Sequence, residues 1–426
     1  MGMHTALFRH SDIQDPYGFY ATMLMENPVI RDKDSGAWII YSYSHCRQLL
    51  HNDKAHIPGQ APGDLELMND YCLRLIRNLV RLRNPSDHLL PRLVTLKLFE
   101  TKVPVSISGI MERLLTQTIA GELPAIPGAP ILAAGNYPSI EGSGDVAGSC
   151  DWMTTVANKL PILILAENFG FSPTDTDRIL ATIGDLVKIM SPARTPEQIT
   201  LLNEAAEEIY LLTEQHLHDN GIYETIQEKI KSLVPLVPAR SGQIPIDKDS
   251  ISVICVCNLM GLFIQSYDAG RGILGNALLQ LLQQGDLSEL QAGNRNYIAA
   301  AVQETLRFDP SVHNTRRILT EDIFIDHTKL EKGQTLVLML AAANRDTRQF
   351  ARPDSFDPHR HNNRELLTFG SGSHECIAGH FATHMTTEAL FYLFQAHPRI
   401  RLLAPPIYEP LINARVPRQL LISLQD

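Results

Sequence analysis

The sequence is poor in features that define whole classes of protein. Its 426 residues include six cysteines, and their positions show no spacing of a disulfide framework, which is typical of proteins from a reducing compartment. No stretch approaches eighteen uninterrupted apolar residues, and the first residues lack a basic region followed by an apolar one. We therefore expect a cytoplasmic protein with no secretory signal and no membrane association.

Positive charge is also scarce. Lys and Arg number 37 against 47 Asp and Glu, for a formal net charge of −10, and no basic cluster offsets this balance. This argues against nonspecific nucleic-acid binding, so we expect no nucleic-acid partner. The hydrophobic fraction of 44% and the charged fraction of 20% are ordinary for a globular protein with a large core.

The most informative stretch, Phe369–Gly379, reads FGSGSHECIAG and leads into a segment with apolar residues three to four positions apart. That spacing predicts a helix, so Cys376 lies at or just before a helix N-terminus, where unpaired amides and the helix dipole favour a thiolate. Gly370 and Gly372 allow positive φ angles beside the sulfur. We interpret Cys376 as an axial ligand of a haem iron. The alternatives are a buried structural cysteine and a phosphate-cradling turn.

This stretch resembles the haem-binding signature of the cytochrome P450 superfamily, Phe-Gly-x-Gly-x-His-x-Cys-x-x-Gly, at every fixed position. The resemblance implies heme b (iron protoporphyrin IX) bound by Cys376. It also implies that His374 donates a hydrogen bond to a haem propionate, and we expect Phe369 to shield the sulfur from water.

Three further residues match propionate-binding positions of that family. His88 and Arg92 are four residues apart on one helix face, so both side chains can reach one anionic group. Such a pair is more often a solvated face, and only the resemblance gives it this role. Arg317 matches the propionate-binding arginine of the family.

A charge pair upstream of the cysteine also matches the family. Glu304-x-x-Arg307 places both charges on one helix face, and exposed pairs of this kind contribute only about 0–1 kcal/mol. The resemblance instead implies a buried network with Arg360 as the third member. The histidines at 359 and 361 lie in a polar loop, and we interpret them as solvated rather than metal-binding.

The segment Ser250–Gln284 is the longest apolar helix that the sequence predicts, and it contains Gly270-Arg271-Gly272-Ile273-Leu274-Gly275. A dinucleotide site needs a short strand and a tight turn before such glycines. Here the preceding apolar run is too long for a strand, so we reject a dehydrogenase. We expect Gly270 and Gly272 to loosen the packing of this helix and to admit water.

The resemblance aligns this helix with the one that crosses the distal face of the haem. The acid of the family pattern is present as Asp268, but Ala269 stands where the family has threonine. Three hypotheses follow: a hydroxyl of the substrate completes the proton relay, Ser266 or Gln265 takes the place of threonine with Asp268 behind it, or the chemistry needs no relay. A fourth is that ordered water alone suffices and that Ala269 makes room for a bulky substrate. We favour a relay supplied by substrate or water.

The implied fold is mainly α with small β-sheets, the cytochrome P450 fold, as a single domain of residues 1–426 around a buried haem. We expect a β-rich part at about 1–60 and a Gly/Pro-rich surface insertion at 121–149. The sequence predicts helices at 175–189 and 196–218, and the resemblance implies that this helical hairpin is a lid over the distal pocket. By resemblance, the substrate contacts lie in 62–79, 189–195, Phe263, Gln265, Ser266, 312–314 and 413–414.

The implied function is that of a haem-thiolate monooxygenase that hydroxylates a small or medium organic molecule with O2. No flavin or iron–sulfur domain accompanies the haem domain in this sequence, so we expect electrons from a separate ferredoxin and ferredoxin reductase, and a monomer. Two alternatives stay open. One is a peroxide-using or non-oxygenating haem-thiolate enzyme, and the other is a haem-based binding or sensing protein without turnover. The sequence names no substrate.

Overall fold

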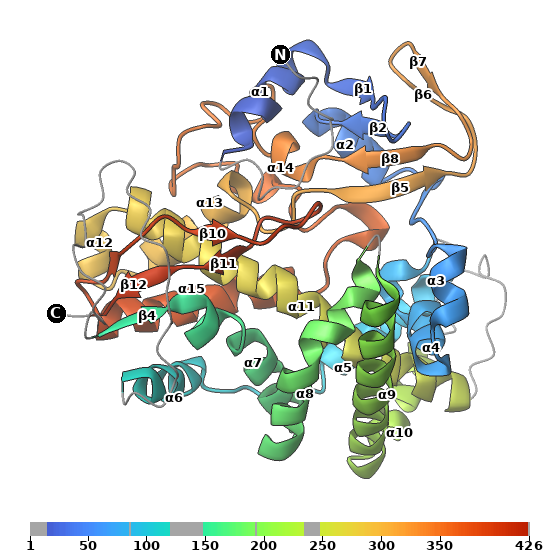
Figure 1. Cartoon of the computed structure of the whole chain (residues 1–426), viewed down its shortest axis with the longest axis horizontal. Coiled ribbons are helices and arrows are strands. Elements are labelled where there is room, and N and C mark those ends of the chain that lie inside the picture. The colour runs from blue at the N-terminus through green and yellow to red at the C-terminus, as the bar shows by residue number, and fades with distance from the viewer. Residues whose placement is uncertain (1–14, 85–86, 120–147, 192–193, 234–247, 425–426) are drawn as a thin grey trace. The chain divides into compact units, whose positions relative to one another are not determined.

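A computed structural model describes residues 15–84, 87–119, 148–191, 194–233 and 248–424 (Figure 1). The insertion predicted at 121–149 lies outside these residues except for its last two positions. The chain divides into two compact units. Unit 1 comprises Met1–Asn52, Ser106–Pro161 and Ala269–Asp426, and unit 2 comprises Asp53–Val105 and Ile162–Asp268.

Both units are mainly helical, as predicted, and helix α11 (Lys248–Gln284) runs through the boundary at residue 268. The other helices of unit 1 are α1 (Tyr17–Glu26), α2 (Tyr43–Leu50), α6 (Ile107–Ile119), the π-helix η2 (Met153–Ala157), α12 (Leu287–Gln291), α13 (Arg295–Phe308), α14 (Leu340–Ala343), η5 (Asn363–Glu365), η6 (Gly372–His374) and α15 (Gly379–Ala396). Those of unit 2 are α3 (Pro62–Leu67), α4 (Asp70–Asn78), η1 (Val80–Leu82), α5 (Leu89–Phe99), α7 (Leu160–Phe169, which begins at the end of unit 1), α8 (Pro173–Leu186), η3 (Val187–Met190), α9 (Pro196–Asp219) and α10 (Ile222–Leu233).

The strands are short and nearly all belong to unit 1. They are β1 (Val29–Arg31), β2 (Trp38–Ile40), β4 (Ser149–Asp151), β5 (Thr315–Leu319), β6 (Ile323–Ile325), β7 (Thr328–Leu330), β8 (Thr335–Leu338), β9 (Arg401–Leu402), β10 (Ile407–Tyr408), β11 (Pro417–Gln419) and β12 (Leu421–Ser423), with β3 (Ala55–His56) in unit 2. Strands β1 and β2 form an antiparallel hairpin within the part predicted to be β-rich. Strand β2 then pairs in parallel with β8, which pairs antiparallel with β5.

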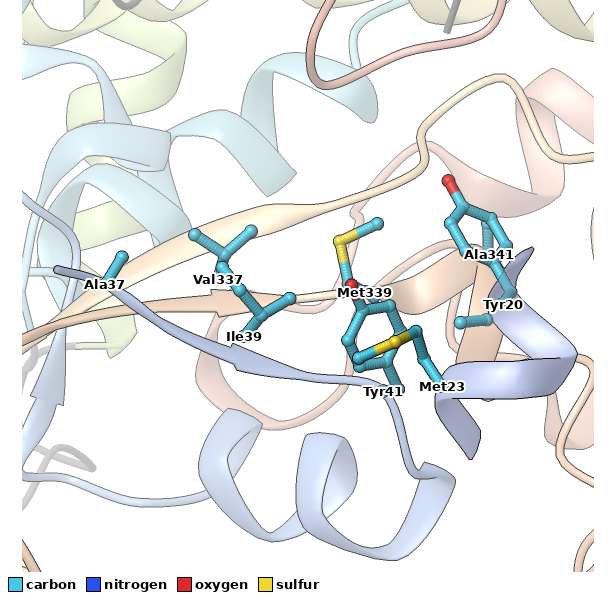
Figure 2. Packing of buried hydrophobic residues seen from close by; sticks show 9 residues of the cluster. Tyr20, Met23, Ala37, Ile39, Tyr41, Val337, Met339 and Ala341 are labelled. Atoms are coloured by element: carbon cyan, nitrogen blue, oxygen red, sulfur yellow. The ribbon is translucent and has the colours of Figure 1, made fainter. Parts of the chain in front are cut away.

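The core over this sheet joins residues from opposite ends of the chain. Figure 2 shows Tyr20 of α1 and Tyr41, which follows β2, gathered with Met339, which follows β8. Ile39 and Val337 are paired strand neighbours in the same cluster. Burying these apolar side chains against one another fixes the N-terminal segment to the β5–β8 part of unit 1.

Most of the predicted helices are confirmed. Two further predictions from the sequence, a single helical stretch at 65–82 and Asp87 as the cap of the next helix, are wrong. The stretch 65–82 is not one helix, because Met68 and Leu79 adopt extended backbone angles and separate α3, α4 and η1. Asp87 does not cap the next helix. His88 occupies that cap position, and the Asp87 carboxylate lies 2.8 Å from the guanidinium of Arg83 instead.

Helix α11 is apolar and long enough to cross a membrane by length and composition alone, but 67% of its most apolar window is buried within the protein. A buried fraction this high is typical of a helix that packs in the core of a protein. Its Gly-x-Gly-x-x-Gly lies wholly within the helix, with no strand or turn before it, which confirms that it is not a dinucleotide-binding turn.

The glycines of the Gly-x-Gly-x-x-Gly in α11 have a packing role, and the expectation that Gly270 and Gly272 loosen this helix is wrong. A Cβ at any of them would lie 3.0 Å or less from a side chain of a neighbouring segment, so each glycine allows a close approach. An added Cβ would lie 3.0 Å from Pro161 Cγ at Gly270, 2.5 Å from Ser311 Cβ at Gly272, and 2.8 Å from Met153 Sδ at Gly275.

Candidate functional site

The cysteine loop, the stretch from Phe369 to Cys376, has the backbone conformation that its glycines predict. Gly370 and Gly372 have φ of 73° and 76°, in the left-handed region. The loop then closes, because the amide of Cys376 donates to the carbonyl of Phe369 at 2.8 Å. Helix α15 begins at Gly379. Cys376 therefore lies three residues before a helix N-terminus, as predicted.

Cys376 differs from the other five cysteines in its exposure. It is exposed, whereas the rest are buried. Burial raises the pKa of Cys72, Cys150 and Cys255 to about 12, and it also raises the pKa of Cys46 and Cys257. Because a thiolate is the metal-binding form of cysteine, Cys376 is the cysteine suited to bind a metal, and the buried-cysteine alternative does not hold for it.

Phe369 fixes the start of the loop to the core of unit 1. Its half-buried ring packs against a cluster of Ile273 from α11, Leu306 from α13 and Leu366. A Cβ at Gly379 would lie 3.2 Å from that ring, so glycine at this position lets the ring lie against the first turn of α15. The aromatic ring thus covers one side of the cysteine loop with apolar surface.

The predicted charge network around Glu304 is present and buried. Glu304 and Arg307 are fully buried, and a guanidinium nitrogen of Arg307 lies 2.6 Å from the Glu304 carboxylate. Arg360 is 3.1 Å from the same carboxylate oxygen, which confirms it as the third member. Buried charges of this kind are tolerated only when they are paired and hydrogen-bonded.

Asn344 connects this network to the cysteine loop. Its carbonyl accepts a hydrogen bond from Arg307 at 2.9 Å, and its side-chain oxygen accepts from the amide of Leu367 at 2.7 Å. Its side-chain nitrogen donates to the hydroxyl of Thr368 at 2.8 Å. Sequence reasoning missed this role, although the segment 343–346 matches the family pattern. Both polar atoms of the Asn344 side chain are hydrogen-bonded in the core. They hold the backbone of Leu367 and Thr368, the two residues that precede Phe369.

The predicted propionate ligands lie in both units. Arg317 is buried in unit 1 and donates to the Thr315 hydroxyl at 2.9 Å and to the Arg316 carbonyl at 2.7 Å. His374 is half-buried in η6. In unit 2, His88 is buried at the start of α5, and burial, followed by the charge of Arg92, lowers the pKa of its imidazole to about 4. The imidazole of His88 is therefore neutral at pH 7.

The distal part of α11 is more open than the rest of the helix. Residues 265–269 are half-buried, whereas residues 254–264 and 270–281 are buried. Within this stretch Gln265 donates to the carbonyl of Gly261 at 3.0 Å, and Ser266 donates to the carbonyl of Phe263 at 3.1 Å. Both side chains therefore bond to their own helix. The half-buried residues include Asp268 and Ala269.

Two predicted substrate segments of unit 1 are joined to one another. Val312 and Ala414 form an isolated antiparallel bridge, and the amide of His313 donates to the carbonyl of Asn413 at 2.9 Å. Val312 is half-buried, while His313 is fully buried. In unit 2, Phe263 and Ile189 are also fully buried, and Phe263 lies edge-on to Phe171.

Comparisons with known proteins agree with these features. A family model described as Cytochrome P450 matches residues 276–397, which include Glu304, Arg307, Phe369 and Cys376. Over these residues the chain matches the cytochrome P450 superfamily, the family whose haem-binding signature its cysteine stretch resembles. Its fold agrees, because the heme domain of a Tepidiphilus thermophilus P450 superposes with a TM-score of 0.75 at 17% identity, covering 98% of this chain and 95% of that one.

Relatives of this chain include two bacterial proteins that match it over different lengths. A putative cytochrome P450 133B1 of Xylella fastidiosa is 36% identical over 60% of this chain and 61% of its own length. Cytochrome P450 CYP107DY1 of Priestia megaterium is 25% identical over 92% of this chain and 91% of its own. The first relatives are thus matched over less than two thirds of their length.

Members of this family bind protohaem through a cysteine thiolate, and the residues of this chain suit that group. An exposed thiol lies on a glycine loop backed by an aromatic ring, and a buried arginine stands at the position expected for a propionate partner. Another kind of metal site is not evident, since no group of three or more His, Cys, Asp or Glu able to hold an ion occurs among the described residues. The histidines at 359 and 361 are exposed, as expected.

Proposed function

We propose that this chain is a haem-thiolate monooxygenase that hydroxylates a small or medium organic molecule. The observation that carries the proposal is the position of Cys376. It is an exposed thiol whose loop is held by Phe369, and the backbone before that ring is held by Asn344 and the buried Glu304 network. When bound, a thiolate-ligated haem supplies O2 activation and the cleavage of the O–O bond.

The chain's own residues then have distinct tasks. Cys376 would supply the thiolate sulfur that holds the iron, and the φ > 0 glycines before it shape the loop that carries this sulfur. Arg317 and Arg92 would pair with the propionate carboxylates, since guanidinium and carboxylate match in charge and geometry. His374 and neutral His88 would add hydrogen bonds to the same carboxylates.

The ligand assignment is tested by the reduced, carbon-monoxide-bound spectrum. Cys376→Ala should abolish the red-shifted absorption of a thiolate ligand. Cys150→Ala removes a buried thiol of the same unit and should keep it. A normal thiolate spectrum in the Cys376→Ala protein rejects the assignment.

For the proton relay we propose that water or a substrate hydroxyl acts beside Ala269, with Asp268 behind it. Gln265 and Ser266 are the alternative donors, and both bond to carbonyls of their own helix. General acid assistance is typically worth about 10²–10⁴ in rate. The measurement is the fraction of consumed electrons that appears in product, for wild type, Ala269→Thr and Asp268→Asn.

Asp268→Asn should lower the fraction of consumed electrons that appears in product. The wild-type protein should turn over without the hydroxyl that Ala269→Thr introduces. If Asp268→Asn leaves turnover and coupling unchanged, no proton path runs through this helix. The peroxide-using or non-oxygenating alternative is then favoured, and the absence of an alcohol at Ala269 is the specific feature that supports it.

The remaining parts of the proposal concern the setting of the enzyme. We propose a cytoplasmic monomer, folded as a single domain of residues 1–426, that takes electrons from a separate ferredoxin and ferredoxin reductase. Product formation that depends on reduced ferredoxin distinguishes this monooxygenase from a peroxide-using enzyme. Product formation with any oxidant distinguishes both from a haem-based sensor.

A further inference from the structure

Ser311 lies behind the two parts of unit 1 predicted to face the substrate. Its side chain is buried, with 1% exposed, and its hydroxyl donates to the carbonyl of Ala269 at 3.1 Å. The next residue along the chain is Val312, which is half-buried and bridged to Ala414. The carbonyl of Ser311 accepts from the amide of Arg415 at 2.8 Å. One residue thus contacts α11 and the C-terminal segment at once.

The sequence of α11 makes this contact fit. An ideal Cβ built at position 272 would lie only 2.5 Å from Ser311 Cβ, so no residue with a side chain fits there without a shift. Val416 Cγ2 lies 3.1 Å from the same point. Gly272 therefore permits both segments to lie against the helix. A carbonyl oxygen has two lone pairs, so that of Ala269 can accept the Ser311 hydroxyl as well as its helical amide partner.

From these contacts we infer that Ser311 is a positioning residue for substrate binding. It sets the separation between the α11 turn at Ala269 and the segment that begins at Val312. The inference rests on the proposed function, because it requires that a ligand lie between these parts and the haem iron. It adds to that function a residue that determines which ligand sizes are accepted, although its own side chain is buried away from the ligand.

The test uses the haem-loaded protein and two iron-binding probes of different size, imidazole and 4-phenylimidazole. Dissociation constants come from the shift of the haem absorption. Ser311→Ala removes the hydrogen bond and lets the two parts separate, so 4-phenylimidazole should gain relative to imidazole by about two- to tenfold, the effect of one neutral hydrogen bond. Ser311→Cys keeps a weak donor and should give an intermediate ratio.

Thr387→Val is the matched control. The Thr387 hydroxyl is buried and donates to a helix carbonyl, that of Thr383, at 2.8 Å. Losing it should lower thermal stability about as much as Ser311→Ala while leaving the ratio of the two dissociation constants unchanged. A ratio that changes equally in both variants means that Ser311 is merely structural, and the inference is then wrong.

Hydrogen exchange supplies a second readout that needs no probe. Ser311→Ala should accelerate exchange in peptides covering 269–274 and 312–315 together, because the hydroxyl joins them. Unchanged exchange and an unchanged ratio reject the inference while leaving the proposed function intact. A wild-type protein that binds neither probe rejects the proposed function, and the inference with it.

Discussion

The side-chain oxygen of Asn344 accepts a hydrogen bond from the amide of Leu367 at 2.7 Å, in the core of unit 1. Twenty-three residues separate the two in the chain. The backbone of Leu367 leads directly to Phe369 and the cysteine loop. The position of that loop therefore depends on an asparagine that Arg307 in turn holds through its carbonyl.

Asn344→Ala should destabilise the cysteine loop, because it leaves the buried Leu367 amide without its acceptor. The expected loss is about 1–3 kcal/mol in the free energy of unfolding, with a smaller share of carbon-monoxide complex in the thiolate form. Chemical denaturation and the reduced spectrum measure these. Asn362→Ala, which removes a half-buried bond to the Gln349 carbonyl, should leave the spectrum unchanged. Equal effects of the two variants contradict the role of Asn344.

Haem-free protein should be alkylated by iodoacetamide at Cys376 far faster than at the other cysteines. Cys376 is exposed, whereas a buried thiol with a pKa of about 12 is only about 10⁻⁴ thiolate at pH 8. Mass spectrometry of digested protein identifies the modified residue. Prior addition of hemin should slow the reaction at Cys376. Rapid labelling of several cysteines, or no protection by hemin, would contradict this assignment.

Arg194 should hold the connection between α8 and α9 to the segment around α3 within unit 2. Its guanidinium side chain is 1% exposed and pairs with Asp64, and it donates to Gln60 at 3.1 Å and to the Lys188 carbonyl at 2.7 Å. Because the Asp64 side chain is 19% exposed, Arg194→Ala should lower the free energy of unfolding by less than the roughly 3–5 kcal/mol lost when a fully buried ion pair is broken.

Hydrogen exchange measures this effect. Peptides covering 60–67 and 187–191 should lose protection together in Arg194→Ala. Arg178→Ala removes an exposed arginine on α8 that pairs with Glu208, and it should leave both segments protected. If only one of the two segments changes in Arg194→Ala, the arginine does not join them.

His88 should make stability depend on pH below neutrality. Its folded pKa of about 4 lies below the ordinary value of 6.5, so between these values the unfolded chain binds more protons than the folded one. Stability is therefore fully present above pH 6.5 and is lost as pH falls toward 4. His88→Gln should flatten this part of the curve of unfolding free energy against pH. An identical slope in wild type and variant would show that His88 does not titrate as described.

The sequence alone determined the features that depend on neighbouring residues. The cysteine loop follows from Phe369–Gly379, because its glycines supply local backbone angles and the apolar spacing after it specifies a helix. The helix at 250–284 and the shared face of Glu304 and Arg307 follow from helical periodicity in the same way. These patterns, with their order along the chain, predicted the family and its haem-binding cysteine as a candidate.

Only the tertiary structure decided which distant segments meet, because packing joins residues that no local pattern relates. The sequence suggested that Gly270 and Gly272 loosen α11, whereas Pro161 and Ser311 pack against them in the structure. Asn344 and Ser311 are ordinary polar residues in the sequence. Their importance comes from buried hydrogen bonds to Leu367 and Ala269, since a polar group in a core is stable only where the fold brings it a partner.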